Sequence, residues 1–151
     1  MLKLWRKRSA ITVSVSESAS QKIHDFAQSK HPIETGGLLL GWWQGENVVV
    51  VDAIEVLDKS ATHTSWVRRE KTAQNALDEA LAGRKDKAGY VGDWHTHPAV
   101  IGASVTDLFS LRRSSRQYTQ PTILAIHKFD GSLEIHAALK GKIRKPEVIY
   151  S

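Results

Sequence analysis

The motif His-Thr-His-Pro at residues 95–98, followed after a short loop by Asp107, most constrains what this chain can fold into. On a β-strand, residues i and i+2 project from the same face about 6.5 Å apart, so the His95 and His97 imidazoles can converge on one ion. Pro98 lacks the N–H that a central ladder needs, so we expect the strand to end there, where a site can open. The motif therefore predicts a buried strand whose end carries two candidate metal ligands.

A helix start follows this strand at Ser104, in the sequence Ser-Val-Thr-Asp. Serine at an N-cap with an acid three residues later forms a capping box and complements the helix dipole, so Asp107 has a purely structural interpretation. In the metal interpretation Asp107 joins His95 and His97. Two nitrogens and one oxygen leave a fourth position for a water, which is the pattern of a catalytic zinc site. Ser104 has a second candidate role, as a hydrogen-bond donor to a developing oxyanion.

Glu34 opens an apolar run, Glu-Thr-Gly-Gly-Leu-Leu-Leu-Gly, far upstream of the histidines. A hydrolytic site needs a group that takes and returns a proton, and Glu34 is the candidate for that role. The alternative is an exposed residue at the start of a strand. Gly36 and Gly37 either allow a neighbouring backbone or a substrate to approach closely, or only relieve crowding before the leucines.

The hydrophobic pattern of the whole chain predicts a single-domain α/β sandwich, in which helices flank a central mixed, mostly antiparallel sheet. Strands are expected at residues 11–15, 34–43, 48–57, 89–97, 122–129 and 133–139, and helices at 17–29, 68–83 and 104–116. The domain should run from residue 11 to residue 145, between a basic N-terminal arm at 1–10 and a C-terminal tail at 146–151. Trp94 and Thr96 should face away from the histidines.

The composition excludes several kinds of catalytic site and indicates a cellular compartment. The 151 residues include no cysteine, so disulfides, a thiolate zinc site and a cysteine nucleophile are all excluded. The longest apolar run, about eight residues at 36–43, is far shorter than the ~20 residues that a transmembrane helix needs. The N-terminal residues carry no apolar stretch after their charges, unlike a secretory signal. These features predict a cytoplasmic protein without a membrane partner.

The formal net charge of +5 arises from basic residues in short groups that are separated along the chain. Charge alone permits a nucleic-acid partner. These groups lack interleaved aromatic residues, however, and are typical of solvated faces. We therefore do not expect nucleic acid as a partner.

Taken together, these motifs resemble the JAMM (MPN-plus) metalloprotease family, whose bacterial members are known as JAB domains. The family pattern is a glutamate that opens a Gly-Gly strand, then His-(Ser/Thr)-His-Pro, then Ser-x-x-Asp. This chain matches the pattern in identity and order over roughly residues 11 to 140. The resemblance implies the MPN/JAB, cytidine-deaminase-like fold and one zinc ion per chain, with a catalytic water. It implies His95, His97 and Asp107 as zinc ligands. It also implies Glu34 as general base and then general acid, with Ser104 stabilising the tetrahedral intermediate.

The resemblance further implies a reaction and a substrate. Family members hydrolyse the isopeptide or peptide bond after the C-terminal glycine of ubiquitin or a ubiquitin-like protein, either to remove it from a target or to mature its precursor. Compact prokaryotic members occur in antiphage conjugation systems and beside sulfur-carrier proteins in biosynthesis. An inactive scaffold of the same fold, binding a protein partner, is the alternative. One departure is that nine residues separate His97 from Asp107, where the family usually has ten. The oligomeric state is not predicted.

A competing interpretation starts from Asp93, because Asp-x-His-x-His also resembles the start of a PHP or amidohydrolase metal site. Those sites lie on the first strand of a barrel that needs roughly 200 or more residues. The motif begins at position 93 of 151, which leaves too little chain. Asp93 is therefore expected to pack or form a salt bridge beside the strand. The remaining histidines are not expected to bind metal: His24, His31, His63, His127 and His136.

Overall fold

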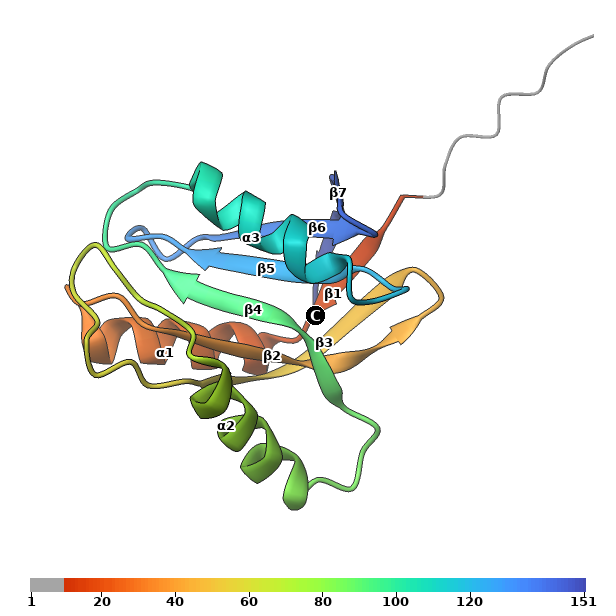
Figure 1. Ribbon diagram of the computed structural model, residues 1–151, viewed down its shortest axis with the longest axis horizontal. Helices are drawn as coiled ribbons and strands as arrows, with labels where there is room; N and C mark the ends of the chain where they lie inside the picture. Colours follow the sequence, from red (N-terminus) through yellow and green to blue (C-terminus); the bar gives the residue numbers. More distant parts are fainter. Residues whose placement is uncertain (1–9) are drawn as a thin grey trace, which may run out of the picture.

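The computed structural model describes residues 10–151 (Figure 1). The basic arm predicted at 1–10 therefore lies outside the described residues, except for Ala10. Eight strands form one sheet in the order β7-β6-β5-β4-β2-β3-β1-β8. The strands are β1 (Thr12–Val15), β2 (Gly36–Gln44), β3 (Asn47–Glu55), β4 (Gly89–Thr96), β5 (Thr122–His127), β6 (Leu133–Leu139), β7 (Lys142–Arg144) and β8 (Glu147–Tyr150). The helices are α1 (Glu17–Lys30), α2 (Glu70–Ala82) and α3 (Val105–Ser115).

The sheet is mixed, as predicted. Its antiparallel pairs are β2–β3, β2–β4, β5–β6 and β6–β7. Its parallel pairs are β1–β3, β1–β8 and β4–β5. Antiparallel pairs are thus the majority, and the prediction of an α/β sandwich with a mostly antiparallel central sheet is confirmed.

Helices cover both faces of the sheet, and the alternation of side chains along the strands shows which helix covers which face. Leu39 packs in the cluster that contains Ile23 of α1, whereas its neighbour Leu38 packs with Ala73 of α2. The same split occurs on β5, where Leu124 packs with α3 and the residues on either side of it pack on the α1 face. Because both faces are buried, β2 and β5 are continuous apolar runs rather than alternating ones.

The central strand β4 follows this alternation. Trp94 is fully buried on the α1 face, where its ring stacks on Phe26 at a centroid distance of 5.6 Å. Its Nε1 donates a hydrogen bond of 3.0 Å to the carbonyl of Ile54. Thr96 is also buried, and its Oγ1 accepts a 3.0 Å hydrogen bond from the Thr35 N–H. These contacts confirm that Trp94 and Thr96 anchor the strand on the face away from the histidines.

The C-terminal residues differ from the sequence prediction. The tail expected at 146–151 is instead mostly strand β8, which pairs in parallel with β1 at the edge of the sheet. The Glu147 N–H donates to Ile11 O at 2.8 Å, and the Ser151 N–H donates to Val15 O at 3.1 Å. Strands β7 and β8 are only three and four residues long, too short for a recognisable hydrophobic period. The unpaired edges of β6 and β1 determine where these strands form.

The helices in the part of the chain that the structure describes are too short or too polar to cross a bilayer.

Two glycines at the start of β2 allow the neighbouring strands to approach closely, Gly36 on the side of β4 and Gly37 on the side of β3. A Cβ added at Gly36 would lie 2.7 Å from the Trp94 carbonyl and 2.9 Å from the His95 Cβ. A Cβ at Gly37 would lie 1.8 Å from the carbonyl oxygen of Ile54. Close approach of neighbouring backbone is therefore the role of this Gly-Gly pair.

Replacing Gly37 with alanine should lower the free energy of unfolding by about 1–3 kcal/mol or more, because strands β2 and β3 must separate to accept the methyl group. Urea unfolding followed by tryptophan fluorescence measures the change. Gly83→Ala is the matched control, since no atom lies within 4 Å of an added Cβ there. Equal stability of the two variants would contradict the described pairing of β2 with β3.

Candidate metal centre

His95 and His97 are placed by the central position of β4. His95 pairs with Gly36 of β2 on one side and with Ile126 of β5 on the other, so the backbone beneath it is fixed from both directions. His97 follows the last residue of β4, and its N–H donates a 2.8 Å hydrogen bond to His127 O. The alternation along the last residues of β4, beyond the register shift at Val91, puts both imidazoles on the face that carries α2 and α3.

Asp107 reaches the same point from the first turn of α3. Ser104 is the N-cap of this helix: its N–H donates to Asp107 Oδ2 at 2.8 Å, and the Asp107 N–H donates to Ser104 Oγ at 3.0 Å. The predicted capping box is therefore present. It is compatible with the metal interpretation, because a carboxylate has about four lone-pair directions and the cap engages one of them.

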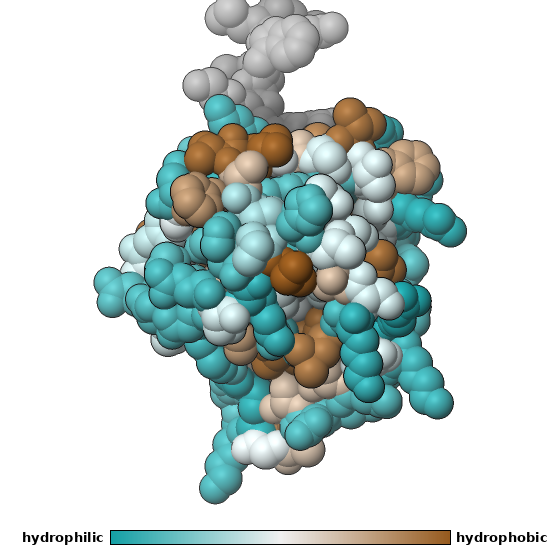
Figure 2. Space-filling model, turned by 90° about the vertical axis from the view of Figure 1, so that its left-hand side faces the viewer, coloured by the Kyte–Doolittle hydropathy of each residue, from teal (hydrophilic) through white to brown (hydrophobic). Residues whose placement is uncertain are grey.

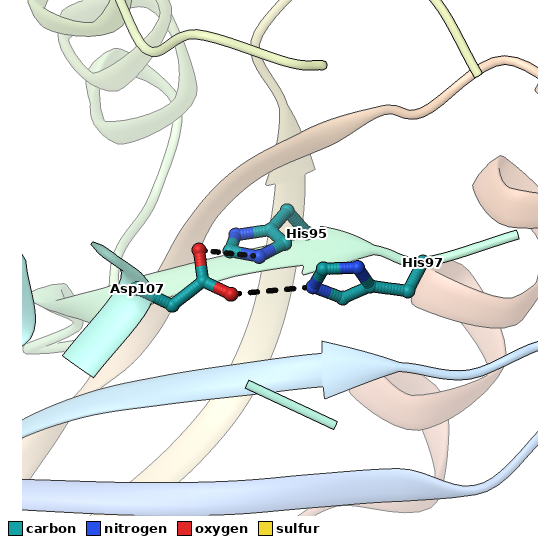
Figure 3. Close-up of side chains that lie close together, drawn as sticks. All are labelled: His95, His97 and Asp107. Carbon is teal, nitrogen blue, oxygen red and sulfur yellow. Dashed lines mark hydrogen bonds and ion pairs between the residues drawn. The ribbon is translucent and has the colours of Figure 1, made fainter. Parts of the chain in front are cut away.

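The three predicted ligands converge, as Figure 3 shows. Nε2 of His95 lies 3.3 Å from Asp107 Oδ1, and Nε2 of His97 lies 3.3 Å from Asp107 Oδ2. One donor atom from each residue can be chosen so that all three lie within 4.8 Å of one another. Donors that bind one tetrahedral zinc ion at about 2.0–2.2 Å lie roughly 3.3 to 3.6 Å apart, and each imidazole lies at this distance from one of the two Asp107 oxygens.

The surroundings of Asp107 keep it ionised. Burial raises its pKa, but the hydrogen bond from His95 and those from Ser104 outweigh burial and hold the pKa well below the ordinary value. A carboxylate binds metal in its deprotonated form. Asp107 is therefore charged and ready to bind a cation across the neutral pH range.

Glu34 lies beside this set. In the antiparallel register that pairs Gly36 with His95, the position across from His97 is Glu34. Its side chain is buried, and Oε1 lies 3.8 Å from His97 Nδ1, beyond hydrogen-bond length. The Glu34 N–H donates to Thr62 O at 2.8 Å, which fixes the backbone. Within residues 10–151 no side-chain hydrogen bond engages its carboxylate, so its oxygens are free to accept a proton.

Burial sets the proton affinity of Glu34. Desolvation raises its pKa above the ordinary value, and the Asp107 charge raises it further, while His95 acts in the opposite direction. The two carboxyl groups of the site thus differ in pKa: Asp107 stays charged, whereas Glu34 holds a proton more readily. The alternative interpretation, in which Glu34 is an exposed residue at the start of a strand, is excluded because its side chain is buried.

Ser104 is exposed at the edge of the site. Its hydroxyl oxygen accepts the hydrogen bond from the Asp107 N–H as a cap, which uses a lone pair. The hydroxyl hydrogen remains available for donation. The two predicted roles of Ser104 are therefore compatible.

Comparison with known proteins agrees with this geometry. Residues 16–139 match the model of the family described as prokaryotic homologs of the JAB domain. The chain belongs to this family.

One named relative and two solved structures are similar to this chain. It is 32% identical over 90 residues to a protein of Sinorhizobium fredii named "Probable metalloprotease y4qB", a match that covers 56% of this chain and 52% of that protein. The chain thus spans about half the length of this relative. The solution structure of protein DSY2949 from Desulfitobacterium hafniense shares the fold, with a TM-score of 0.63, 18% identity and 92% of each chain covered. The crystal structure of AF2198, a JAB1/MPN domain protein from Archaeoglobus fulgidus, is 19% identical with a TM-score of 0.49, covering 90% of this chain and 98% of that one.

This JAB-family chain has a groove beside the His–His–Asp set. It has a volume of about 580 Å³ and runs between α3 and the segment 66–70. The Trp66 ring lies 6.2 Å from the His95 ring and forms one wall. The role of Trp66 could not be predicted from the sequence, because an aromatic residue in a polar connection gives no periodic signal.

Asp93 does not join the metal ligands. Its Oδ1 accepts a 2.7 Å charged hydrogen bond from Arg68, and its Oδ2 accepts one of 3.0 Å from the Tyr90 hydroxyl. The expected salt bridge beside the strand is confirmed. It ties the segment before α2 to β4 and so fixes the wall of the groove next to His95.

The other histidines lie elsewhere. Over residues 10–151, His95, His97 and Asp107 form the one group of three donors close enough to share an ion. His24 and His127 face each other at 3.1 Å across α1 and β5, and His136 pairs with Glu134. These three histidines therefore lie outside the group of donors formed by His95, His97 and Asp107.

Substituting His95, His97 or Asp107 singly with alanine should abolish stoichiometric metal binding, because each supplies one of three donors. Metal content after gel filtration, measured by inductively coupled plasma mass spectrometry, checks this. His63→Ala, in an exposed loop, should bind metal like the wild type. Full metal content in the His97 and Asp107 variants would show that the ligands are wrongly assigned.

Proposed function

We propose that this chain is a zinc-dependent peptidase that hydrolyses the bond after the C-terminal glycine of a ubiquitin-like protein. The observation that carries the proposal is the convergence of His95, His97 and Asp107, with the buried Glu34 carboxylate 3.8 Å from His97. The family match and the relative named a probable metalloprotease support peptidase chemistry. Two imidazoles and one carboxylate favour zinc among the divalent ions, with a position left open for water.

The residues divide the reaction between them. His95, His97 and Asp107 would hold the ion, which would act as a Lewis acid and make water nucleophilic near neutral pH. Glu34 takes a proton from the attacking water as the C–O bond forms, and then returns this proton to the leaving nitrogen as the C–N bond breaks. Its raised pKa suits both halves of this transfer. Ser104 donates its hydroxyl hydrogen to the carbonyl oxygen as negative charge develops there.

The surface around the site favours a protein substrate. Figure 2 looks onto the end of the molecule at which β4 ends, and hydrophobic side chains are spread among hydrophilic ones over this face. Val100 and Ile101, in the loop after His97, are 63% and 61% exposed, and Phe109 of α3 is 62% exposed. Contiguous exposed apolar groups are typical of protein-binding surfaces, and the adjacent Val100 and Ile101 are our candidate for the apolar part of this one. A glycine tail, which lacks side chains, passes between Trp66 and α3 with the least obstruction.

The cellular compartment and the pathway are inferred from the proposed substrate. We place the reaction in the cytoplasm, in either the deconjugation or the maturation of a ubiquitin-like protein. A bacterial antiphage conjugation system is the first candidate, and processing of a sulfur-carrier protein is the second. Both systems supply a small protein that ends in glycine. If the purified chain contained no zinc, the alternative of an inactive scaffold that binds a protein partner would be favoured.

Glu34→Gln should retain zinc and lose turnover by about 10²-fold or more, because the amide cannot take the proton. The substrate is a small ubiquitin-like protein ending in Gly-Gly, fused to a peptide through its last glycine, with cleavage followed by mass spectrometry. Glu79→Gln, on the exposed surface of α2, is the control and should cleave like the wild type. Undiminished cleavage by Glu34→Gln would remove this residue from the mechanism.

Ser104→Ala should lower turnover by roughly 10²–10³-fold through loss of an oxyanion donor. It should also lower stability by about 1 kcal/mol through loss of the cap. Ser104→Thr keeps both a hydroxyl and a capping oxygen, and should recover most of both properties. A variant that loses stability alone would show that Ser104 only caps α3.

A further inference from the structure

The loop at residues 98–103 determines whether Asp107 meets the histidines. It has no helix or strand of its own, yet it joins His97 to the capped start of α3. Its first half is held by backbone, because the Phe129 N–H donates to Ala99 O at 3.3 Å. Its second half is held by a side chain, since the Ala103 N–H donates to Glu134 Oε1 at 3.1 Å. This contact lies directly before Ser104, where α3 begins.

Glu134 of β6 is itself fixed. Lys128 Nζ lies 3.1 Å from Glu134 Oε2, and His136 Nε2 contacts Glu134 Oε1. The hydrogen bond from the Ala103 N–H, followed by that from His136, lowers the pKa of Glu134 to about 2. The carboxylate is thus charged and restrained at both oxygens near neutral pH.

The loop is shaped to receive this carboxylate. A Cβ added at Gly102 would lie 2.4 Å from Glu134 Oε2 and 2.7 Å from Oε1, so only glycine leaves room for it. Next to it, Ala103 packs against the apolar cluster under α3, which contains Leu111 and Leu124. Glu134 therefore contacts two consecutive loop residues directly before Ser104.

We propose that Glu134 is a positioning residue, which clamps the loop at 98–103 so that Asp107 stays within reach of His95 and His97. The clamp acts through Ala103 and the Ser104 cap and does not touch the metal or the substrate. This inference rests on the proposed function, because it takes the three ligands as a metal centre. It extends that function by assigning ligand placement to a residue on β6, outside the motifs that carry the ligands.

Zinc affinity tests the clamp. Competition titration against a chromophoric chelator should show that Glu134→Ala binds zinc about tenfold or more weakly, the range for loss of a group that supports metal ligands. The visible absorption of the cobalt-loaded variant should also change, because it reports how Asp107 coordinates. Glu134→Gln keeps an oxygen that accepts from the Ala103 N–H, so it should recover most of the affinity. Glu79→Ala removes the same charge from exposed α2 and should match the wild type.

The outcomes separate the clamp from the proposed function. If the wild type binds zinc and Glu134→Ala binds it equally well with an unchanged cobalt spectrum, the clamp is overturned and the proposed function stands. If Glu134→Ala does not fold, Gly102→Ala displaces the carboxylate while leaving Lys128 and His136 in place. Weaker zinc binding by that variant supports the clamp, and wild-type affinity overturns it. A wild type that binds no zinc overturns both.

Discussion

The position of β4 between β2 and β5 is the constraint on which the rest of the site depends. Hydrogen bonding on both edges fixes the direction in which His95 and His97 project. The register with β2 then brings Glu34 opposite His97, although 62 residues separate them in the chain. The parallel partner β5 supplies the carbonyl of His127 that holds the backbone of His97. Two proposed ligands and the proposed proton carrier are therefore positioned mainly by sheet pairing, and the Thr62 carbonyl additionally holds the Glu34 backbone.

The third proposed ligand is placed by different means, so the site has one part held by strand pairing and one part held by a helix start. Asp107 depends on a helix start and on a loop without secondary structure, and its contacts to both imidazoles are 3.3 Å long. The hydrogen bonds that keep Asp107 charged come from the same cap and histidines that orient it. Glu34 lies on the part held by strand pairing, where burial raises its pKa. One carboxylate is thus kept charged by its surroundings, and the other is made more basic. Such a difference in pKa allows two like groups of one site to have different roles.

Much of this arrangement follows from short-range sequence patterns. His95 and His97 share a face because strand side chains alternate, and Ser104 with Asp107 specifies a helix start, so these could be predicted. The register that carries Glu34 to His97 could not be derived from local patterns, and only the family resemblance indicated it. Trp66, Arg68 and Glu134 were missed because each acts through a tertiary contact. Strand β8 was missed because the free edge of β1, rather than its own four residues, determines its structure.

Zinc K-edge X-ray absorption of the wild-type protein tests the central claim most directly, since it reports the atoms around the ion in solution. We expect a four-coordinate ion with two imidazole ligands and oxygen donors, at about 2.0–2.2 Å. The histidine carbons should give multiple scattering beyond the first shell. A spectrum with oxygen donors alone, or one that corresponds to a single imidazole, would contradict the assignment of His95, His97 and Asp107 as one metal centre.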